Sequence, residues 1–114
     1  MNQNLKIEIL LEEVLKRNAS DLHIQVAVPP MFRVDGLLAP MSGYQALSEL
    51  EVQSLIFSVL DEEQKQILLK DKEFDFSFAF GDKARFRVNA FHESGNLAMA
   101  LRVIPSKIYS IEEL

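Results

Sequence analysis

Three successive runs of alternating apolar and polar residues between positions 73 and 105 restrict the fold more than any other feature of this chain. They read EFDFSFAF, ARFRVNAF and LAMALRVIP. Because successive side chains of an extended strand point to opposite faces, each run predicts a β-strand with one apolar face. Turns at 81–83 and 93–96 then make the three strands antiparallel neighbours. The side chains expected on the core face are Phe74, Phe76, Phe78, Phe80, Phe86, Val88, Ala90, Met99, Leu101 and Val103.

The register of the last two strands follows from the same pattern. A four-residue loop at 93–96 pairs His92 with Leu97 and therefore Arg87 with Arg102, and a slip of one residue would turn every side chain over. Two like charges that face each other on adjacent strands repel by up to ~1 kcal/mol. A sequence chosen only for stability would avoid this pair, whereas a bound anion would turn the repulsion into a two-pronged clamp. Arg85 lies on the same face.

The segment NASDLHIQVAVPPMFRVDG, residues 18–36, predicts a second hairpin. Residues 21–26 alternate as a half-buried strand does, and the double proline that follows cannot continue a strand inside a sheet. A second strand at 31–34 leads into Asp35-Gly36, a preferred pair for a tight hairpin turn, which sends residues 37 and 38 back antiparallel.

Helical patterns surround these strands. Apolar residues recur at helical spacing from Asn4 to Arg17. Ser48 with Glu51 forms a capping box that opens a second helix, and Asp61 caps a third that runs to about residue 70. Strands and helices in this order predict an α+β fold, a mostly antiparallel sheet with helices packed on one face.

Four polar residues of the first hairpin are expected on its open faces: Asp21, His23, Arg33 and Asp35. They are interpreted either as a contact surface for another domain or subunit or as ordinary solvated surface. Arg33 and Asp35, two apart on one strand face, are also placed to pair with each other. The pattern disfavours a catalytic set of Ser20, Asp21 and His23, because three neighbours on one strand do not converge as nucleophile, base and orienting group do.

Composition narrows the class of protein. The chain has 114 residues, enough for one domain, and a net charge of −5. Residues 1–82 hold 7 basic and 14 acidic side chains, whereas residues 83–110 hold 5 basic side chains and 1 acidic one. An acidic body with a local basic strand pair favours a focused anion contact over general polyanion binding. Cysteine is absent and no His, Asp or Glu cluster has ligand spacing, so no metal site is predicted.

The N-terminus carries charges through its apolar part and no small-residue cleavage site, so it does not read as a signal peptide. No apolar run approaches the ~20 residues needed to span a bilayer. A cytoplasmic location is the expectation.

Together, the segments ASDLHI with PPMFRVDG, FDFSFAF with ARFRVNAF, and LRVIPSKIYSIEEL resemble one family. The chain from Ala19 to Leu114 is similar to the N-terminal domain of the type IV pilus retraction ATPases, the PilT-type twitching-motility proteins. A looser resemblance extends to the wider secretion-ATPase superfamily of pilus assembly and type II secretion. The Asn-Ala-Phe and Ile-Pro-Ser-Lys segments favour the retraction branch.

The resemblance implies a PAS-like domain at residues 1–106 and, at 107–114, the start of a linker to a RecA-like motor domain. In the family the motor domain binds ATP with Mg²⁺, and six subunits form a ring in which each N-terminal domain packs on the neighbouring motor domain. Arg87 and Arg102 match the arginines that approach the ATP phosphates, with Arg85 a less certain third. Asp21, His23, Arg33 and Asp35 would then be interface residues.

The resemblance also implies a location in the cytoplasm at the inner face of the cytoplasmic membrane, an indirect contact with the pilus machinery, and no nucleic-acid partner.

The sequence departs from the family pattern in two ways. The phosphate-binding loop G-x-x-x-x-G-K-[ST] is absent from these 114 residues, so this chain alone should not hydrolyse ATP. Ala27 stands where the family usually has Gly, and if that Gly takes a positive φ, we expect a different local turn here. Ser110 with the acidic residues after it reads as the first turn of a further helix that is cut off, which indicates a piece of a longer protein.

Three other functions remain open at this stage. The first is the same role in a pilus-assembly or type II secretion ATPase. The second is a nucleic-acid-binding module, with Arg85, Arg87, Arg102 and Phe91 as a stacking platform on one sheet face. The third is a PAS-type sensor of small ligands, which would need an apolar pocket. The four phenylalanines at 74, 76, 78 and 80, here called the phenylalanine stripe, are expected to fill that space instead.

Overall fold

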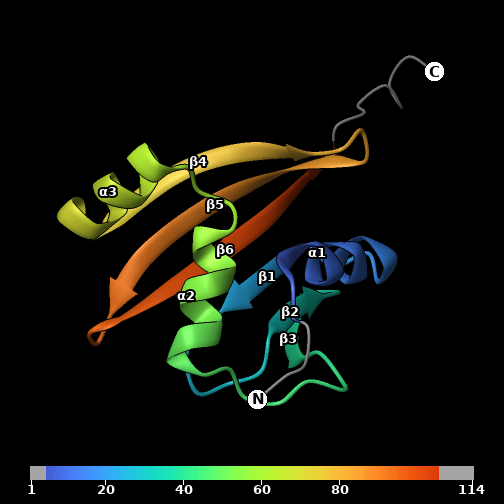
Figure 1. Ribbon diagram of the computed structural model, residues 1–114. Helices are drawn as coiled ribbons and strands as arrows, with labels where there is room; N and C mark the ends of the chain where they lie inside the picture. The colour runs from blue at the N-terminus through green and yellow to red at the C-terminus, as the bar shows by residue number, and fades with distance from the viewer. Residues whose placement is uncertain (1–4, 106–114) are drawn as a thin grey trace.

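The computed structural model describes residues 5–105, which form one six-stranded antiparallel sheet and three helices (Figure 1). The order along the chain is α1 (Ile7–Lys16), β1 (Asp21–Ile24), β2 (Met31–Val34), β3 (Leu37–Pro40), α2 (Glu49–Phe57), α3 (Glu62–Asp71), β4 (Glu73–Phe80), β5 (Ala84–Glu93) and β6 (Asn96–Pro105). Across the sheet the order is β3-β2-β1-β6-β5-β4. The predicted α+β class is confirmed. The expected helix start at Ser110 lies outside the described residues.

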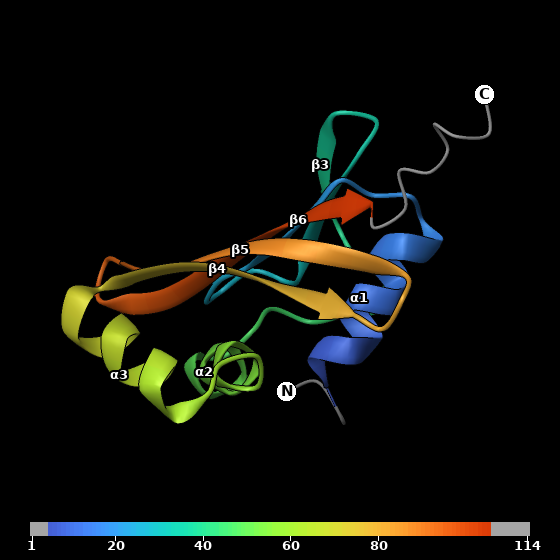
Figure 2. The ribbon, with the colours of Figure 1, turned by 90° about the horizontal axis from the view of Figure 1, so that it is seen from above.

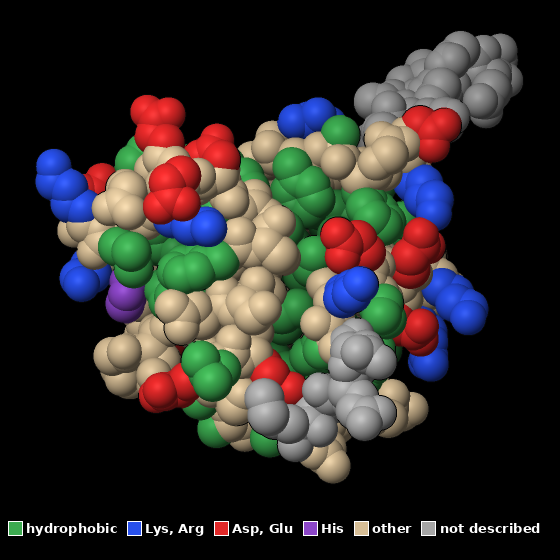
Figure 3. Space-filling view, in the orientation of Figure 1, with side chains coloured by type: hydrophobic (Ala, Val, Ile, Leu, Met, Phe, Trp, Pro, Cys, Tyr) green, Lys and Arg blue, Asp and Glu red, His purple; other side chains and the backbone are tan. Residues whose placement is uncertain are grey.

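The three helices lie on one face of the sheet and leave the other face open (Figure 2). α1 contacts β1, α2 contacts β6 and α3 contacts β4, so each helix covers a different part of the sheet. Between the two layers sit the fully buried side chains, which include Leu10, Leu22, Ile56, Phe86 and Leu101. On the helix-covered side, basic and acidic side chains are interspersed (Figure 3). No helix in the described part of the chain is long and apolar enough to span a bilayer.

The predicted register of the hairpin formed by β5 and β6 is confirmed. Arg87 pairs with Arg102 and His92 with Leu97. The connection is tighter than the predicted four-residue loop, because Glu93 pairs with Asn96 and only Ser94 and Gly95 turn the chain, with φ of 53° and 84°. Two successive positive φ values match the twist of the strands that such a turn joins. The Asp35-Gly36 turn has the same form, with φ of 53° and 81°.

The predicted helix caps are also confirmed. The Ser48 side chain accepts from the Glu51 N–H, and the Glu51 carboxylate accepts in return from the Ser48 N–H. Asp61 and Gln64 repeat this arrangement at the start of α3. Each box satisfies two backbone donors that a helix N-terminus would otherwise leave without partners.

The phenylalanine stripe of β4 is less buried than predicted. All four rings face the helix layer and pack against the core, but each remains partly exposed. The reason is that β4 is an edge strand, so the rings have neighbours on one side only. Ring centroids are 5.5 Å apart for Phe74 and Phe76 and 5.8 Å apart for Phe78 and Phe86, separations at which aromatic pairs attract each other.

Ala27 takes a positive φ of 76° in the turn between β1 and β2. Its N–H donates to the carbonyl of Leu47 over 2.9 Å, and the Leu47 N–H donates to the carbonyl of Val28 over 3.0 Å. These two backbone hydrogen bonds hold a conformation that favours glycine. Alanine therefore adopts a positive φ at this position, and the expectation that the turn differs from that of the family stays a prediction.

Candidate anion site on the open face of the sheet

Four charged residues form one row across the open face of the sheet. Arg87 of β5 pairs with Arg102 of β6, Arg102 pairs with Asp21 of β1, and Asp21 pairs with Arg33 of β2. Because residues directly opposite each other in a sheet share a face, the four side chains stand side by side. We call Arg87, Arg102, Asp21 and Arg33 the charged row. It joins two hairpins that lie far apart in the sequence.

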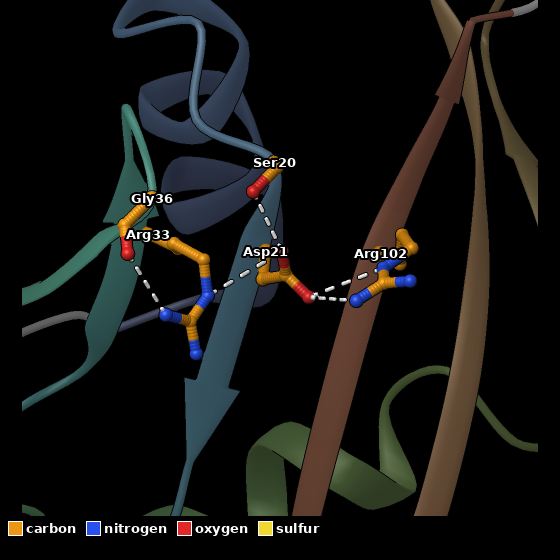
Figure 4. A network of polar contacts seen from close by, with 5 residues as sticks. All are labelled: Ser20, Asp21, Arg33, Gly36 and Arg102. Atoms are coloured by element: carbon orange, nitrogen blue, oxygen red, sulfur yellow. Dashed lines mark hydrogen bonds and ion pairs between the residues drawn. The ribbon is translucent and has the colours of Figure 1, made fainter.

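Asp21 lies between Arg102 and Arg33 in the charged row, and both arginine side chains reach toward its carboxylate (Figure 4). Only 7% of this residue is exposed. Its Oδ2 accepts from Nε and Nη2 of Arg102 over 3.3 and 3.2 Å, and its Oδ1 accepts from the Ser20 hydroxyl over 2.6 Å. The Arg33 Nε lies 3.9 Å from Oδ1. Asp21 lies on the open face of the sheet, as predicted, but its carboxylate is buried and has hydrogen-bond partners within the chain. Its role as an interface residue stays a prediction.

Several groups act on the pKa of Asp21. Burial alone would raise this pKa, but the hydrogen bonds from Ser20 and Arg102, together with the charge of Arg102, lower it below its ordinary value. The carboxylate therefore stays ionised at neutral pH. An ionised carboxylate beside Arg102 also offsets part of the repulsion between Arg102 and Arg87.

The two arginines predicted to form a clamp differ in how they are held. The Arg102 side chain is 69% exposed but anchored on Asp21. Arg87 is exposed and makes no hydrogen bond or ion pair with any residue from 5 to 105. The pair therefore offers one held and one unheld guanidinium group to the open face.

Arg85 lies on the same face as the charged row but outside it. In the register it pairs with Ala79 of β4 and Ile104 of β6. Its Nη2 donates to the Ser77 hydroxyl over 3.0 Å, which turns the side chain toward the edge strand.

A depression of about 290 Å³ lies beside the charged row. Ala100 lies between His23 and Asn89 in the register, and its short side chain leaves room that a larger residue would fill. Asp75 and Asn89 line the same depression, with the Asn89 amide donating to the Asp75 carboxylate over 2.5 Å. Sequence reasoning did not single out these two residues, and it considered Ser20 only as a member of a catalytic set. The sequence did hold a signal for Asp75 and Asn89, because both occupy polar positions of alternating strands and are therefore expected on the open face.

His23 is half-buried at this depression, and its Nε2 is buried without a hydrogen-bond partner among residues 5–105. Burial lowers the pKa of His23, the carboxylate of Asp21 opposes that effect, and the charges of Arg33 and Arg102 add to it. The neutral imidazole is therefore the favoured form in the folded chain.

Arg33 and Asp35 do not pair with each other. The Nη1 of Arg33 donates to the carbonyl of Gly36 over 3.2 Å, while its Nε approaches Asp21. Asp35 is exposed in the turn at the end of the hairpin. Of the four predicted interface residues, the structure brings Asp21, His23 and Arg33 together and leaves Asp35 apart from them. In the described part of the chain, no cluster of three or more His, Cys, Asp or Glu side chains is arranged to hold a metal ion.

Comparison with known proteins gives consistent matches over nearly the whole chain. The type IV pilus retraction ATPase PilT of Pseudomonas aeruginosa is 38% identical over 110 residues, which cover 96% of this chain and 32% of that protein. A twitching motility protein of Neisseria gonorrhoeae is 40% identical over 85 residues, covering 75% of this chain and 22% of that protein. No protein-family model matches.

A solved structure agrees with the sequence matches. The crystal structure of the pilus retraction motor PilT with bound ADP superimposes with a TM-score of 0.88 at 34% identity, over 97% of this chain and 32% of that one. The chain therefore spans about a third of the length of the two PilT proteins, and its match covers 22% of the twitching motility protein.

Proposed function

This chain is homologous to the N-terminal region of the type IV pilus retraction ATPases, and on that premise we propose that it is the N-terminal domain of a hexameric retraction motor that supplies arginines to ATP. The ATP, with Mg²⁺, would be held mainly by a RecA-like motor domain beyond this chain. Residues 1–106 would form the domain and residues 107–114 the start of the linker. Such a motor would work in the cytoplasm at the inner face of the cytoplasmic membrane and act on the pilus machinery.

The observation that carries this proposal is the pairing of Arg87 with Arg102 on an exposed sheet face. Two adjacent guanidinium groups repel, and Asp21 balances only one of them. A polyphosphate placed before them would accept several charge-assisted hydrogen bonds at once. Because the chain as a whole carries a net charge of −5, this local pair of arginines favours a focused contact with an anion.

The chemistry expected of the two arginines is electrostatic. In phosphoryl transfer, negative charge is spread over the oxygens of the transferred group, and an arginine supplied from another domain or subunit stabilises that charge. Arg87 and Arg102 would have this catalytic role, and Arg85 would add a further contact to the nucleotide. They neither form nor break a bond themselves, so the reaction would depend on the motor domain.

The surface beside the charged row would meet the motor domain of a neighbouring subunit. His23, Arg33 and Asp35 reach this surface from the first hairpin, and Asp21 would act there through Arg33 and Arg102, which it contacts. The partners are then the chain's own motor domain and the adjacent subunits of a homo-hexamer.

The test is kinetic and uses the full-length protein. Replacing Arg102→Ala or Arg87→Ala should lower kcat for ATP hydrolysis by about 10³-fold, the lower end of the effect of arginines of this kind, with a smaller change in KM. Lys70→Ala is the matched control, because Lys70 is an exposed cation on α3, on the helix-covered side. Unchanged turnover in both arginine variants would remove the proposed role.

A further inference from the structure

We propose that Asp21 is a positioning residue for Arg102, holding its guanidinium group by one edge so that the other edge is presented to a phosphate. The inference rests on the proposed function and adds to it a residue that need not touch ATP. It is drawn from the contacts of the charged row.

The two hydrogen bonds from Arg102 use one edge of its guanidinium group. Nε and Nη2 both donate to Oδ2 of Asp21. A guanidinium group has five N–H donors in a fixed planar fork, so three remain. Nη1 and the second N–H of Nη2 form the end edge, which is suited to two parallel hydrogen bonds with phosphate oxygens. Asp21 and a phosphate can therefore bind Arg102 at the same time without competing for one donor.

The anchor is itself fixed. The Ser20 hydroxyl donates to Oδ1 over 2.6 Å, and Arg33 approaches the same oxygen. The Asp21 side chain is 10% exposed, whereas the Arg102 side chain is 69% exposed. A buried, constrained carboxylate thus holds an exposed cation, the arrangement expected where orientation of the cation matters.

Arg87 provides the contrast within the same row. It faces Arg102 directly and has no comparable anchor among residues 5–105. A group that is already oriented needs little reorganisation when charge develops on the substrate, whereas an unheld group must first be ordered. Arg102 is therefore the pre-oriented prong of the pair and Arg87 the adaptable one. The row keeps an excess of positive charge, because it contains three arginines and one aspartate.

The first experiment measures the kinetics of the full-length protein. Asp21→Ala should lower kcat for ATP hydrolysis by about 10²-fold, the loss that follows when a reacting group is misplaced by about 1 Å, and KM for ATP should change little. Asp21→Asn, which keeps an oxygen acceptor and the side-chain shape, should lose less. In an Arg102→Ala background Asp21→Ala should cause no further loss, because both changes remove the same interaction.

The second experiment observes Arg102 directly by ¹⁵N NMR of the 114-residue chain. In the unaltered chain the Arg102 Nε–H should give a separate, slowly exchanging signal, and Asp21→Ala should move it to the position of a solvated arginine. The Arg87 Nε–H signal is the internal control and should stay unchanged. Far-UV circular dichroism checks that each variant folds, and Asp21→Asn provides the measurement if Asp21→Ala does not.

The outcomes separate the two proposals. If Arg102→Ala lowers kcat and both Asp21 variants leave it unchanged, the positioning role is wrong and the proposed function stands. Additive losses in the double variant would show a general structural role for Asp21 and would also overturn the inference. If Arg102→Ala leaves kcat unchanged, the positioning role fails, and if Arg87→Ala also leaves kcat unchanged, the proposed function fails with it.

Discussion

At the scale of single residues, the charged row shows how a carboxylate can be buried without losing its charge. Removing an ionised group from water is costly unless it is paired and hydrogen-bonded. Asp21 receives hydrogen bonds from Ser20 and Arg102 and lies close to Arg33, so β2, β6 and the residue before β1 all contribute partners to one side chain. His23, two residues along the same strand, is in the opposite situation, because its buried Nε2 has no described partner.

This difference predicts how stability depends on pH. The pKa of His23 is lowered in the folded chain, chiefly by burial, so protonation is easier in the unfolded state. The neutral form of His23 therefore contributes to the free energy of unfolding. This contribution is complete above the ordinary histidine pKa of 6.5 and is lost as pH falls through the lowered pKa of the folded state. The charged groups that face His23 are Asp21, Arg33 and Arg102, and Asp21, with its own pKa lowered, stays ionised throughout this range.

The measurement is urea unfolding at about pH 7.5 and about pH 5.5. The unaltered chain should lose more free energy of unfolding on acidification than His23→Gln, which cannot titrate. Equal losses in the two proteins would mean that His23 is not the group responsible.

At the scale of elements, the turn at Ala27 gives a second prediction. A non-glycine residue in the left-handed region destabilises the folded state by roughly 1–2 kcal/mol. Glycine avoids this strain but lowers the free energy of unfolding by up to about 1 kcal/mol, because it gives the unfolded chain more conformational freedom. Ala27→Gly should therefore stabilise the chain by about 0.5–1 kcal/mol, seen as a higher urea midpoint. Both backbone hydrogen bonds to Leu47 are kept, because they involve no side chain.

Ala39→Gly in β3 is the control for that substitution. Ala39 is exposed and is not among the residues with positive φ, so glycine brings only the entropic cost there, roughly 0.5–1 kcal/mol of destabilisation. A destabilised Ala27→Gly chain would show that the positive φ at position 27 stores no strain.

The elements themselves could be predicted from local patterns. Period-2 alternation predicted β4, β5 and β6, and the Ser48 and Asp61 caps marked the starts of α2 and α3. The pairing of Arg87 with Arg102 was predicted correctly although the turn is shorter than expected, because the predicted loop and the observed turn have the same centre. The burial of the phenylalanine stripe was overestimated, because alternation shows which face is apolar but not whether the strand lies at the sheet edge.

The position of Asp21 could not be predicted, for a reason that belongs to the whole molecule. Its partner Arg102 is 81 residues away in the sequence, on β6. Local patterns specify hairpins, but the pairing of β1 with β6 joins two hairpins, and nothing within either one determines it. The same pairing creates the candidate site, since it places the first hairpin beside the two predicted arginines. The resemblance to a known family supplied the arginines as candidates but no contact with Asp21.

The distribution of charge over the whole molecule also separates phosphate recognition from nucleic-acid binding. Single-strand binding needs a positive groove that follows the backbone and several aromatic faces for the bases. Here Glu73 and Asp75 lie on the same sheet face as the arginines, Phe91 is half-buried, and the net charge is −5. A single-stranded nucleic acid long enough to extend past the charged row would meet the carboxylates of β4.

We therefore expect no submicromolar affinity for a labelled single-stranded DNA, measured by fluorescence anisotropy at low salt. Low salt is the condition most favourable to binding, because phosphate contacts release counterions and weaken as salt rises. Arg87→Ala is the control variant, since it removes the unanchored cation of the row while leaving the Asp21 contacts in place. A submicromolar affinity that weakens with salt and is lost in Arg87→Ala would establish the competing function and assign the exposed arginines to a nucleic-acid backbone instead of a nucleotide.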